Sequence, residues 1–459
     1  MALALVHALA SPYIENSHCS KCAAARDTTY PEVASSYTKG PILNDSNLTT
    51  QVVSKGLKYP TSMAFLGPND ILVTEKNTGT VRRIVNGTLL PRPLLDVNVA
   101  TFAHRGMLGI AVVPLHYRPL LHNKATSESN MSAAHVFLYF TQAATKDGDD
   151  VTEGKEPLGN RIYRYELVNN RLVEPKLLLN LPASPGAIGY GGKITIGANN
   201  DLYLSVGDIG INGHLTKAQN IQNGLDPDGT SGILRIDENG NAVKPGILGS
   251  KYPLDLYYSY GIWNSFGMDF DPISGRLWDT ENGLIFGDEI NLVEPGFNSG
   301  YGKVDGVWLR GFSLEQTERH PAGLEPGDLV SFGGRGKYHP PNFTWFRSIA
   351  PTAIKFLPSE KLGEKYQNDM FVGDIINGYL YHFKLNRQRT DLVLPAGPLS
   401  DRVVNSTDML KPIIFGMGFG GITDIKIGPG SSGYLYVLTF SKTEGTIFKI
   451  VPKDIRRQN

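Results

Sequence analysis

The chain has 459 residues, with 44 Lys and Arg against 44 Asp and Glu, so its formal net charge at pH 7 is zero. A balanced charge argues against nucleic acid or an anionic membrane surface as the main partner, because both require a basic surplus to displace counterions. Hydrophobic residues make up 41% of the chain, which excludes wholesale disorder, and no apolar run reaches the roughly 18 residues of a membrane span. The 51 Gly, 21 Tyr and 19 Phe favour many short strands joined by tight turns.

The first ten residues, MALALVHALA, form a short apolar stretch that ends in small residues before Ser11. That ending fits the rule for signal-peptidase cleavage, so residues 1–10 are interpreted as a signal peptide truncated at its start, with an ordinary N-terminal tail as the alternative. Residues 11–50 are predicted to be an extended segment. Six glycosylation sequons suit an exported, secreted or cell-surface glycoprotein. They lie at Asn44, Asn47, Asn86, Asn130, Asn342 and Asn405.

The extended segment contains both cysteines of the chain, Cys19 and Cys22, preceded by His18. One CxxC pair cannot supply the four thiolates of a structural zinc site, and a His before the pair reverses the order that attaches c-type haem. A small surface disulfide or an unstructured leader is predicted. The alternative is metal capture by His18 and the two thiols, with a function in electron transfer.

After residue 50, one pattern recurs along the chain: an apolar strand, a turn with Pro, Gly or Asn, and a second apolar strand. Clear copies begin at Ser62, Gly192, Gly267 and Gly421, and looser copies begin at Met107 and Thr352. Each repeat forms a twisted sheet that cannot bury both faces alone, so neighbouring repeats must pack around a common axis. The sequence therefore predicts an all-β, six-bladed β-propeller of four-stranded antiparallel blades over residues 51–459.

Four motifs carry a more specific resemblance. They are Gly106–Pro114 (GMLGIAVVP), Gly192–Asp208 (GKITIGANNDLYLSVGD), Gly261–Glu281 (GIWNSFGMDFDPISGRLWDTE) and Asp288–Tyr301 (DEINLVEPGFNSGY). With these motifs in this order, the chain resembles the soluble quinoprotein glucose and sorbosone dehydrogenases. The resemblance implies a six-bladed propeller that binds pyrroloquinoline quinone (PQQ) with calcium and oxidises aldose sugars.

The resemblance also implies where catalysis would occur. Family members carry a His in the pattern HxGG as general base for hydride transfer from the sugar to the quinone. The matching stretch here begins at Gly189, which has no side chain to accept a proton. The family pattern GxRN places an Arg and an Asn on the quinone, and here Trp263 and Asn264 hold these positions. Both are expected beside any bound quinone, and Trp263 could also stack on a sugar ring.

The implied calcium ligands are the carbonyl oxygens of a Gly and a Pro, and these positions are Gly283 and Leu284 here. The family Lys of the fifth blade has no counterpart within Gly373–Gly378, and the RxRD pattern of the last blade reads Gly421 to Asp424 (GITD). A tricarboxylate in a pocket of low dielectric constant needs several cations or donors. These replacements argue against PQQ binding in the family manner.

Further candidates lie near these motifs. His104 precedes Gly106, where the family has a residue lining the quinone, and His214 follows Asp208 in a loop. Either could substitute as the base, and the alternative is a solvated loop histidine. Three carboxylates could bind a structural cation or cap turns. They are Asp208, Asp288 and Glu289.

Two functions follow from these residues. In the first, the chain is a secreted propeller, catalytically altered or inactive, that binds a sugar, a glycan or a cell-surface partner. In the second, it is an active PQQ- and calcium-dependent aldose sugar dehydrogenase, with His104 or His214 as the base and Asn264 on the cofactor. The first is favoured because the base and most of the cationic positions are replaced.

Overall fold

The computed structural model describes residues 40–115, 134–210, 215–284, 286–309, 328–441 and 444–453. The predicted leader, the segment with His18, Cys19 and Cys22, the loop residue His214 and the sequon at Asn130 lie outside these residues. What the sequence predicts for them therefore stays a prediction. No helix in the described part of the chain is long and apolar enough to cross a membrane.

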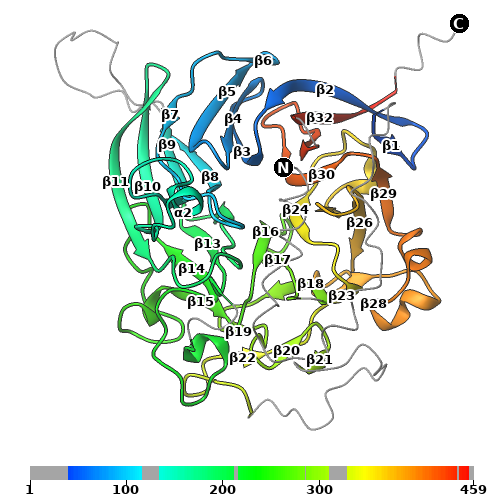
Figure 1. Ribbon diagram of the computed structural model, residues 1–459. Coiled ribbons are helices and arrows are strands. Elements are labelled where there is room, and N and C mark those ends of the chain that lie inside the picture. The colour runs from blue at the N-terminus through cyan, green and yellow to red at the C-terminus, as the bar shows by residue number, and fades with distance from the viewer. Residues whose placement is uncertain are drawn as a thin grey trace, which may run out of the picture.

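Six sheets of four to six strands surround a common centre (Figure 1). Sheet 1 contains β3 (Pro60–Gly67), β4 (Asp70–Glu75), β5 (Thr80–Val85), β6 (Thr88–Leu89) and β7 (Leu95–Asp96). Sheet 2 contains β8 (Met107–Pro114), β9 (Ala134–Gln142), β10 (Gly159–Val168) and β11 (Arg171–Leu181), with the short helix α2 (Asp149–Thr152) between β9 and β10. Sheet 3 contains β12 (Ile194–Ile196), β13 (Leu202–Val206), β14 (Gly232–Ile236), β15 (Tyr257–Tyr260), β19 (Phe297–Asn298) and β22 (Lys337–Tyr338).

The second half of the chain forms the other three sheets. Sheet 4 contains β16 (Ser265–Phe270), β17 (Leu277–Glu281), β18 (Phe286–Val293), β23 (Phe343–Arg347) and β28 (Val403–Val404). Sheet 5 contains β24 (Pro351–Phe356), β25 (Met370–Asp374), β26 (Leu380–Leu385), β27 (Leu392–Val393), β29 (Ile414–Met417) and β1 (Ile42–Leu43). Sheet 6 contains β30 (Gly421–Ile427), β31 (Leu435–Phe440), β32 (Gly445–Pro452) and β2 (Leu48–Leu57).

A separate ribbon pairs β20 (Val304–Asp305) with β21 (Trp308–Leu309). Short 3-10 helices lie at Lys217–Gln219, Leu254–Leu256, Glu364–Tyr366, Pro398–Asp401 and Thr407–Leu410. In each of the six sheets, four strands that are neighbours in the sheet pair antiparallel. The parallel pairs between strands all involve the added strands β19, β22 and β28. The predicted all-β propeller with four-stranded antiparallel blades is therefore confirmed.

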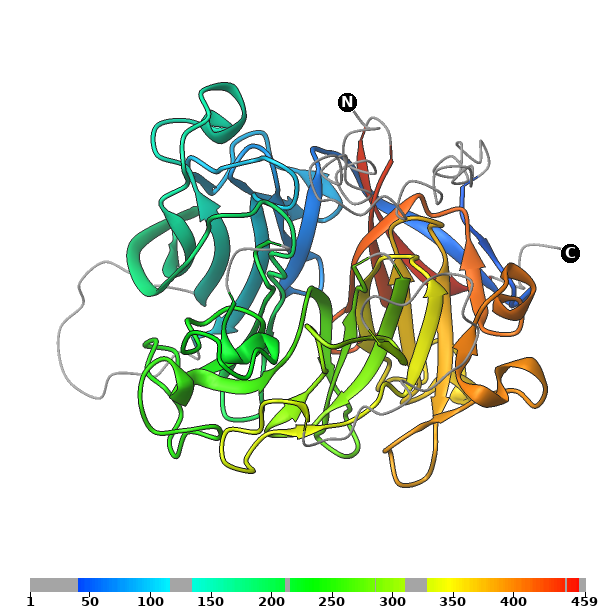
Figure 2. The same cartoon turned by 60° about the horizontal axis from the view of Figure 1, so that its bottom comes forward.

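Strands from opposite ends of the sequence close the ring. The early strand β2 pairs with β32 from Leu48 opposite Pro452 to Leu57 opposite Gly445, and β1 pairs with β29. The blue and red strands lie side by side in both views (Figures 1 and 2). Residues 42–43 and 48–50 thus pair within these sheets, ahead of residue 51, where the sequence predicts the propeller to begin.

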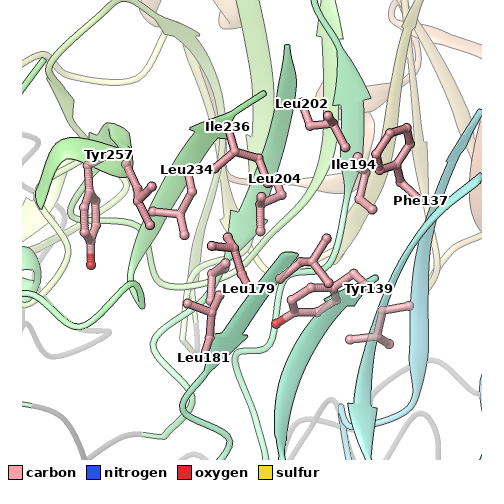
Figure 3. Close-up of a cluster of buried hydrophobic side chains, with 14 of the residues drawn as sticks. Phe137, Tyr139, Leu179, Leu181, Ile194, Leu202, Leu204, Leu234, Ile236 and Tyr257 are labelled. Atoms are coloured by element: carbon pink, nitrogen blue, oxygen red, sulfur yellow. The ribbon is translucent and has the colours of Figure 1, made fainter. Parts of the chain in front are cut away.

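The strands are buried on both faces because sheets pack against both of their sides. In β31 (LYVLTF) every residue is buried, which explains the continuous apolar run. Figure 3 shows one of the clusters, in which Phe137 and Tyr139 of sheet 2 pack with Leu204 and Ile236 of sheet 3. Full burial of one such side chain contributes about 1.5–3 kcal/mol.

The first strand of every sheet lies nearest the centre. These strands, β3, β8, β12, β16, β24 and β30, contact one another in a closed ring. The residues at their starts line one pocket and the residues toward their ends line another. The ring of first strands therefore has one pocket at each end, and the interior of this ring is here called the channel.

Candidate functional site

The pocket at the starts of the first strands, here called the axial pocket, takes wall residues from strands of five sheets and from Gly192 and Lys193, which directly precede β12 of sheet 3. It contains about 820 Å³ of space not filled by atoms, counted out to its open mouth. Its aromatic wall residues are Tyr59, Phe266 and Phe440, and its polar ones include Ser62, Lys76, His104, Lys193, Asn282, Thr352 and Thr423. A concave wall with a few polar groups among apolar ones is typical of a small-molecule site.

His104 precedes β8 in the pocket wall and is only 6% exposed. Its Nδ1 accepts a hydrogen bond of 3.0 Å from the backbone N–H of Gly189. Because a donor faces Nδ1, the proton of the neutral ring is on Nε2. A nitrogen that already carries a proton cannot accept another, so this geometry makes His104 a hydrogen-bond donor and supplies no base at Nε2.

Gly189, the position of the family base, lies against Trp263. Its φ is 74°, a left-handed conformation that residues with a β-carbon rarely adopt. A β-carbon on Gly189 would lie 3.4 Å from both the indole Nε1 and the carbonyl oxygen of Trp263. The Trp263 Nε1 is buried and has no hydrogen-bond partner among the described residues. Trp263, at the position of the family Arg, therefore occupies the space beside the position of the family base.

Asn264 holds a glycine turn in place. It is fully buried, and its Oδ1 accepts a hydrogen bond of 3.0 Å from the backbone N–H of Gly191. The described wall of the axial pocket includes His104 and Asn282 but not Gly189, Trp263 or Asn264. The structure thus brings His104 to the pocket and places the other predicted cofactor residues behind it, where their contact with a quinone stays a prediction.

Two of the predicted metal residues, Gly283 and Asp288, are joined to each other. The Gly283 N–H donates to Asp288 Oδ1 at 2.8 Å, and the Ile349 and Ala350 N–H groups donate to Asp288 Oδ2 at 2.7 and 2.8 Å. Burial raises the pKa of Asp288 to about 6, although the hydrogen bonds from these donors lower it. The carboxylate thus connects the loop after β17 to the loop before β24, two loops that reach the pocket wall at Asn282 and Ala350.

The other predicted metal positions show no shared geometry. Asp208 is 2% exposed, and its Oδ2 accepts a hydrogen bond of 2.8 Å from the Tyr301 hydroxyl. Leu284 is half-buried after Gly283. Within the described ranges, no group of three or more His, Cys, Asp or Glu is placed to hold a metal ion. The calcium site therefore stays a prediction.

Buried carboxylates lie behind the pocket in sheet 4. The Ser299 hydroxyl is 2.6 Å from Glu281 Oε2 and 3.1 Å from Glu289 Oε2. The backbone N–H of Trp263 donates to Glu281 Oε1 at 2.6 Å. Burial raises the pKa of Glu289 to about 8 and that of nearby Asp279 to about 7. Burial and the adjacent Glu289 raise the pKa of Glu281 as well. This group therefore retains protons at neutral pH.

The sequence interpretation missed two lysines of the pocket wall, Lys76 and Lys193. The Lys76 Nζ donates to Asn77 Oδ1 at 3.1 Å. Burial lowers the pKa of Lys76 to about 8, although the negative charge of Asp150 raises it. Lys193 forms an ion pair with Asp424 of β30. Both lysines directly flank a buried strand, and a charged residue in that position is the signal that could have identified them.

The described wall does not fit PQQ in the family manner. Its side-chain ammonium groups are Lys76 and Lys193, and Lys193 is already paired with Asp424. Arg105, next to His104, is held by Asp150 and Tyr190. One ammonium group, that of Lys76, is then left without an ion pair among the described residues, and it cannot offset the desolvation of three carboxylates.

Comparison with known proteins identifies the family. The Glucose / Sorbosone dehydrogenase family matches residues 57–449. The Synechocystis protein slr1608 is 25% identical over 410 residues, 86% of this chain and 85% of that protein. Aldose sugar dehydrogenase YliI of Escherichia coli is 24% identical over 416 residues, 89% of this chain and 94% of that protein. The solved PQQ-bound form of aldose sugar dehydrogenase from Streptomyces coelicolor has the same fold, with a TM-score of 0.58 and 20% identity over 89% of this chain and 99% of that one. The resemblance inferred from the motifs is confirmed: the chain belongs to the Glucose / Sorbosone dehydrogenase family.

Proposed function

We propose that this chain is a family propeller that binds a sugar or glycan in the axial pocket and does not transfer hydride to PQQ through the family base. The observation that carries the proposal is the contact between Gly189 and Trp263. Gly189 supplies no basic side chain at the base position, and Trp263 supplies no guanidinium beside it.

The polar groups of the pocket support a hydroxyl-bearing ligand. Asn282 is 4% exposed, and its Oδ1 has no hydrogen-bond partner among the described residues. A buried acceptor without a partner costs about 1–3 kcal/mol, which a ligand donor would recover. His104 supplies a donor in the same wall, and Phe266 supplies an aromatic surface. A sugar hydroxyl both donates and accepts, so it complements this pair of groups.

We also infer that the six sheets are the six blades of one ring. The closed ring of contacts between first strands supports this inference, and so does the axial pocket, whose wall is formed at or directly before the first strand of every sheet.

The second candidate is an active PQQ- and calcium-dependent aldose sugar dehydrogenase. It is favoured by the positions of His104 and Lys76 in the pocket wall and by the name of the relative YliI. It requires His104 to give up the hydrogen bond from Gly189, because only then can the ring accept a proton on the nitrogen nearest a substrate.

Two titrations separate these functions. With aldoses and oligosaccharides in a calorimeter, we expect saturable binding that Asn282→Ala weakens at least tenfold, while the exposed Asn405→Ala leaves it unchanged. With PQQ and calcium chloride, we expect no saturable absorbance change and no aldose-dependent dye reduction. Saturable PQQ binding, with aldose oxidation that His104→Gln abolishes, would establish the dehydrogenase. No sugar or glycan binding at all would overturn the first proposal.

We further propose that the protein is an extracytoplasmic glycoprotein, secreted or bound to a cell-surface partner. The leader and the exposure of four sequon residues support this, namely Asn44, Asn47, Asn86 and Asn405. Asn342 is 4% exposed, and its Oδ1 accepts a hydrogen bond from the Leu292 N–H, so this sequon is closed to glycosylation in the folded chain. Secretion from a glycosylating host, followed by glycosidase digestion and peptide mass mapping, tests the proposal. An unmodified intracellular product would overturn it.

A further inference from the structure

The opposite end of the channel holds a second pocket, here called the distal pocket, toward the ends of the first strands. It contains about 1010 Å³ of space not filled by atoms, counted out to its mouth. The axial pocket, counted in the same way, contains about 820 Å³. The proposed sugar site therefore uses the smaller of the two spaces and leaves the larger one without a function.

The wall of the distal pocket combines apolar and polar surface. The side chains of Phe65, Phe270 and Phe356 contribute aromatic surface from three sheets, and Ile110, Ile196 and Ile427 contribute aliphatic surface from the other three. The apolar part of this wall favours a ligand with an apolar body, because burial of apolar area stabilises a complex.

The charged groups of the wall are Asp269, Lys355 and Lys426. The Lys355 Nζ lies 2.6 Å from Asp269 Oδ1, and the Phe356 N–H donates to Asp269 Oδ2 at 2.9 Å. This pair is complete in itself, so it does not require a charged ligand.

Lys426 is different, because its charge is not matched. Its closest carboxylate oxygen is Asp424 Oδ2 at 3.8 Å, and its Nζ makes no hydrogen bond to any of the described residues. Asp424 is already engaged: its Oδ1 pairs with Lys193, and its Oδ2 accepts hydrogen bonds from the Ser62 hydroxyl at 3.0 Å and the Met63 N–H at 2.9 Å. Three lysines, Lys193, Lys355 and Lys426, thus face two aspartates, which leaves one positive charge in the channel.

We propose that the distal pocket binds an organic monocarboxylate. The carboxylate lies on Lys426 Nζ, and the apolar body lies against the aromatic side chains of Phe65, Phe270 and Phe356. One negative charge neutralises the one unmatched positive charge. A neutral apolar ligand would leave Lys426 without a partner, and a dianion would bring one more desolvated charge than the wall can pair.

The pKa of Lys426 supports this assignment. Burial, together with Lys193 and Lys355, lowers it to about 7, although Asp424 and Asp269 act in the opposite direction. The wall residues from β3 and β8 are Ala64, Phe65 and Ile110–Val112, which do not titrate. A bound carboxylate favours the protonated lysine, so binding should weaken as the pH rises through 7.

The test is calorimetric titration of the full-length protein with octanoate and with its neutral counterpart octanamide. At pH 6 we expect octanoate to bind at least tenfold more tightly than octanamide, and we expect this preference to shrink at pH 8.5. Lys426→Met should remove the preference, and Lys426→Arg should retain it. The matched control is Lys384→Met, an exposed lysine of β26, which should change nothing.

Equal binding of octanoate and octanamide by the unmodified protein would overturn the proposal, and this comparison does not depend on the folding of any variant. An unchanged preference in Lys426→Met would overturn it as well. His104→Gln, in the axial pocket, should leave octanoate binding intact, so failure of the sugar proposal and failure of this one are distinguishable.

Discussion

The β-carbon position of Gly189 lies 3.4 Å from the indole Nε1 of Trp263. The family has a His and an Arg at these two positions, whereas this chain has a glycine, which lacks a side chain, beside a tryptophan. The two replacements therefore lie in van der Waals contact, so a side chain restored at position 189 would pack directly against Trp263.

Gly189→His should destabilise the fold more than the same change at a glycine without neighbours. Gly430 is the matched control, because its φ is 62° and nothing lies within 4 Å of its β-carbon position. Both variants bear left-handed strain of about 1–2 kcal/mol, but only a His at 189 must also fit its ring against Trp263, which we expect to cost about 1–3 kcal/mol more. Urea unfolding measures the difference, and equal losses in the two variants would contradict the contact.

The neutral ring of His104 should carry its proton on Nε2. The Gly189 N–H occupies Nδ1 at 3.0 Å, so that nitrogen is the acceptor. Imidazole 15N chemical shifts of protein labelled at histidine report the tautomer, with His104→Gln to assign the signal. An Nδ1–H tautomer would contradict the geometry and would restore His104 as a candidate base.

The sequence predicted the propeller because each strand buried on both faces appears as an apolar run between turn residues. It could not predict the contact between Gly189 and Trp263, since these residues follow different sheets and only packing brings them together. The pairing of the strands before residue 51 was hidden for a related reason. The β2 sequence (LTTQVVSKGL) has exposed residues like those of a tail, and its partner β32 lies at the other end of the chain.

The cations of the channel were equally hidden. A lysine within or beside an apolar strand can face either end of a propeller. The position of Lys76 or Lys426 next to apolar residues therefore marks a candidate but does not assign it to one of the two pockets. Only the structure shows that Lys76 lies in the axial pocket and Lys426 in the distal one.

Asp288→Asn should loosen the pocket wall without any metal. The carboxylate accepts backbone hydrogen bonds from Gly283, Ile349 and Ala350, and an amide cannot accept on both of its ends. We expect a loss of about 1–3 kcal/mol in the free energy of unfolding and weaker sugar binding. Thermal unfolding with and without calcium checks the predicted metal site. Stabilisation by calcium in the unmodified protein, lost in Asp288→Asn, would show that Asp288 belongs to a calcium site.

The free energy of unfolding should fall as the pH rises from about 5 to 8. The pKa of Asp279 is raised from 3.8 to about 7 and that of Glu289 from 4.5 to about 8, both mainly by burial. The folded state therefore holds protons that the unfolded state has released, and this stability is lost as the pH passes the folded pKa values. Asp279→Asn should reduce the slope by up to about 1.4 kcal/mol per pH unit. Urea unfolding at several pH values measures it, with the exposed Glu364→Gln as control, and an unchanged slope in Asp279→Asn would contradict the assignment.

The closing strand β2 should be essential to the ring through its buried end. Leu57 is fully buried with Met63, Ile71, Leu438 and Ile447, so it joins sheet 6 to sheet 1, whereas Val52 on the same strand is 51% exposed. Leu57→Ala should cost about 2–5 kcal/mol of unfolding free energy, and Val52→Ala should stay within about 0.5 kcal/mol. Denaturant unfolding of the two variants compares them directly. Similar small losses at both positions would mean that the ring does not depend on this strand for closure.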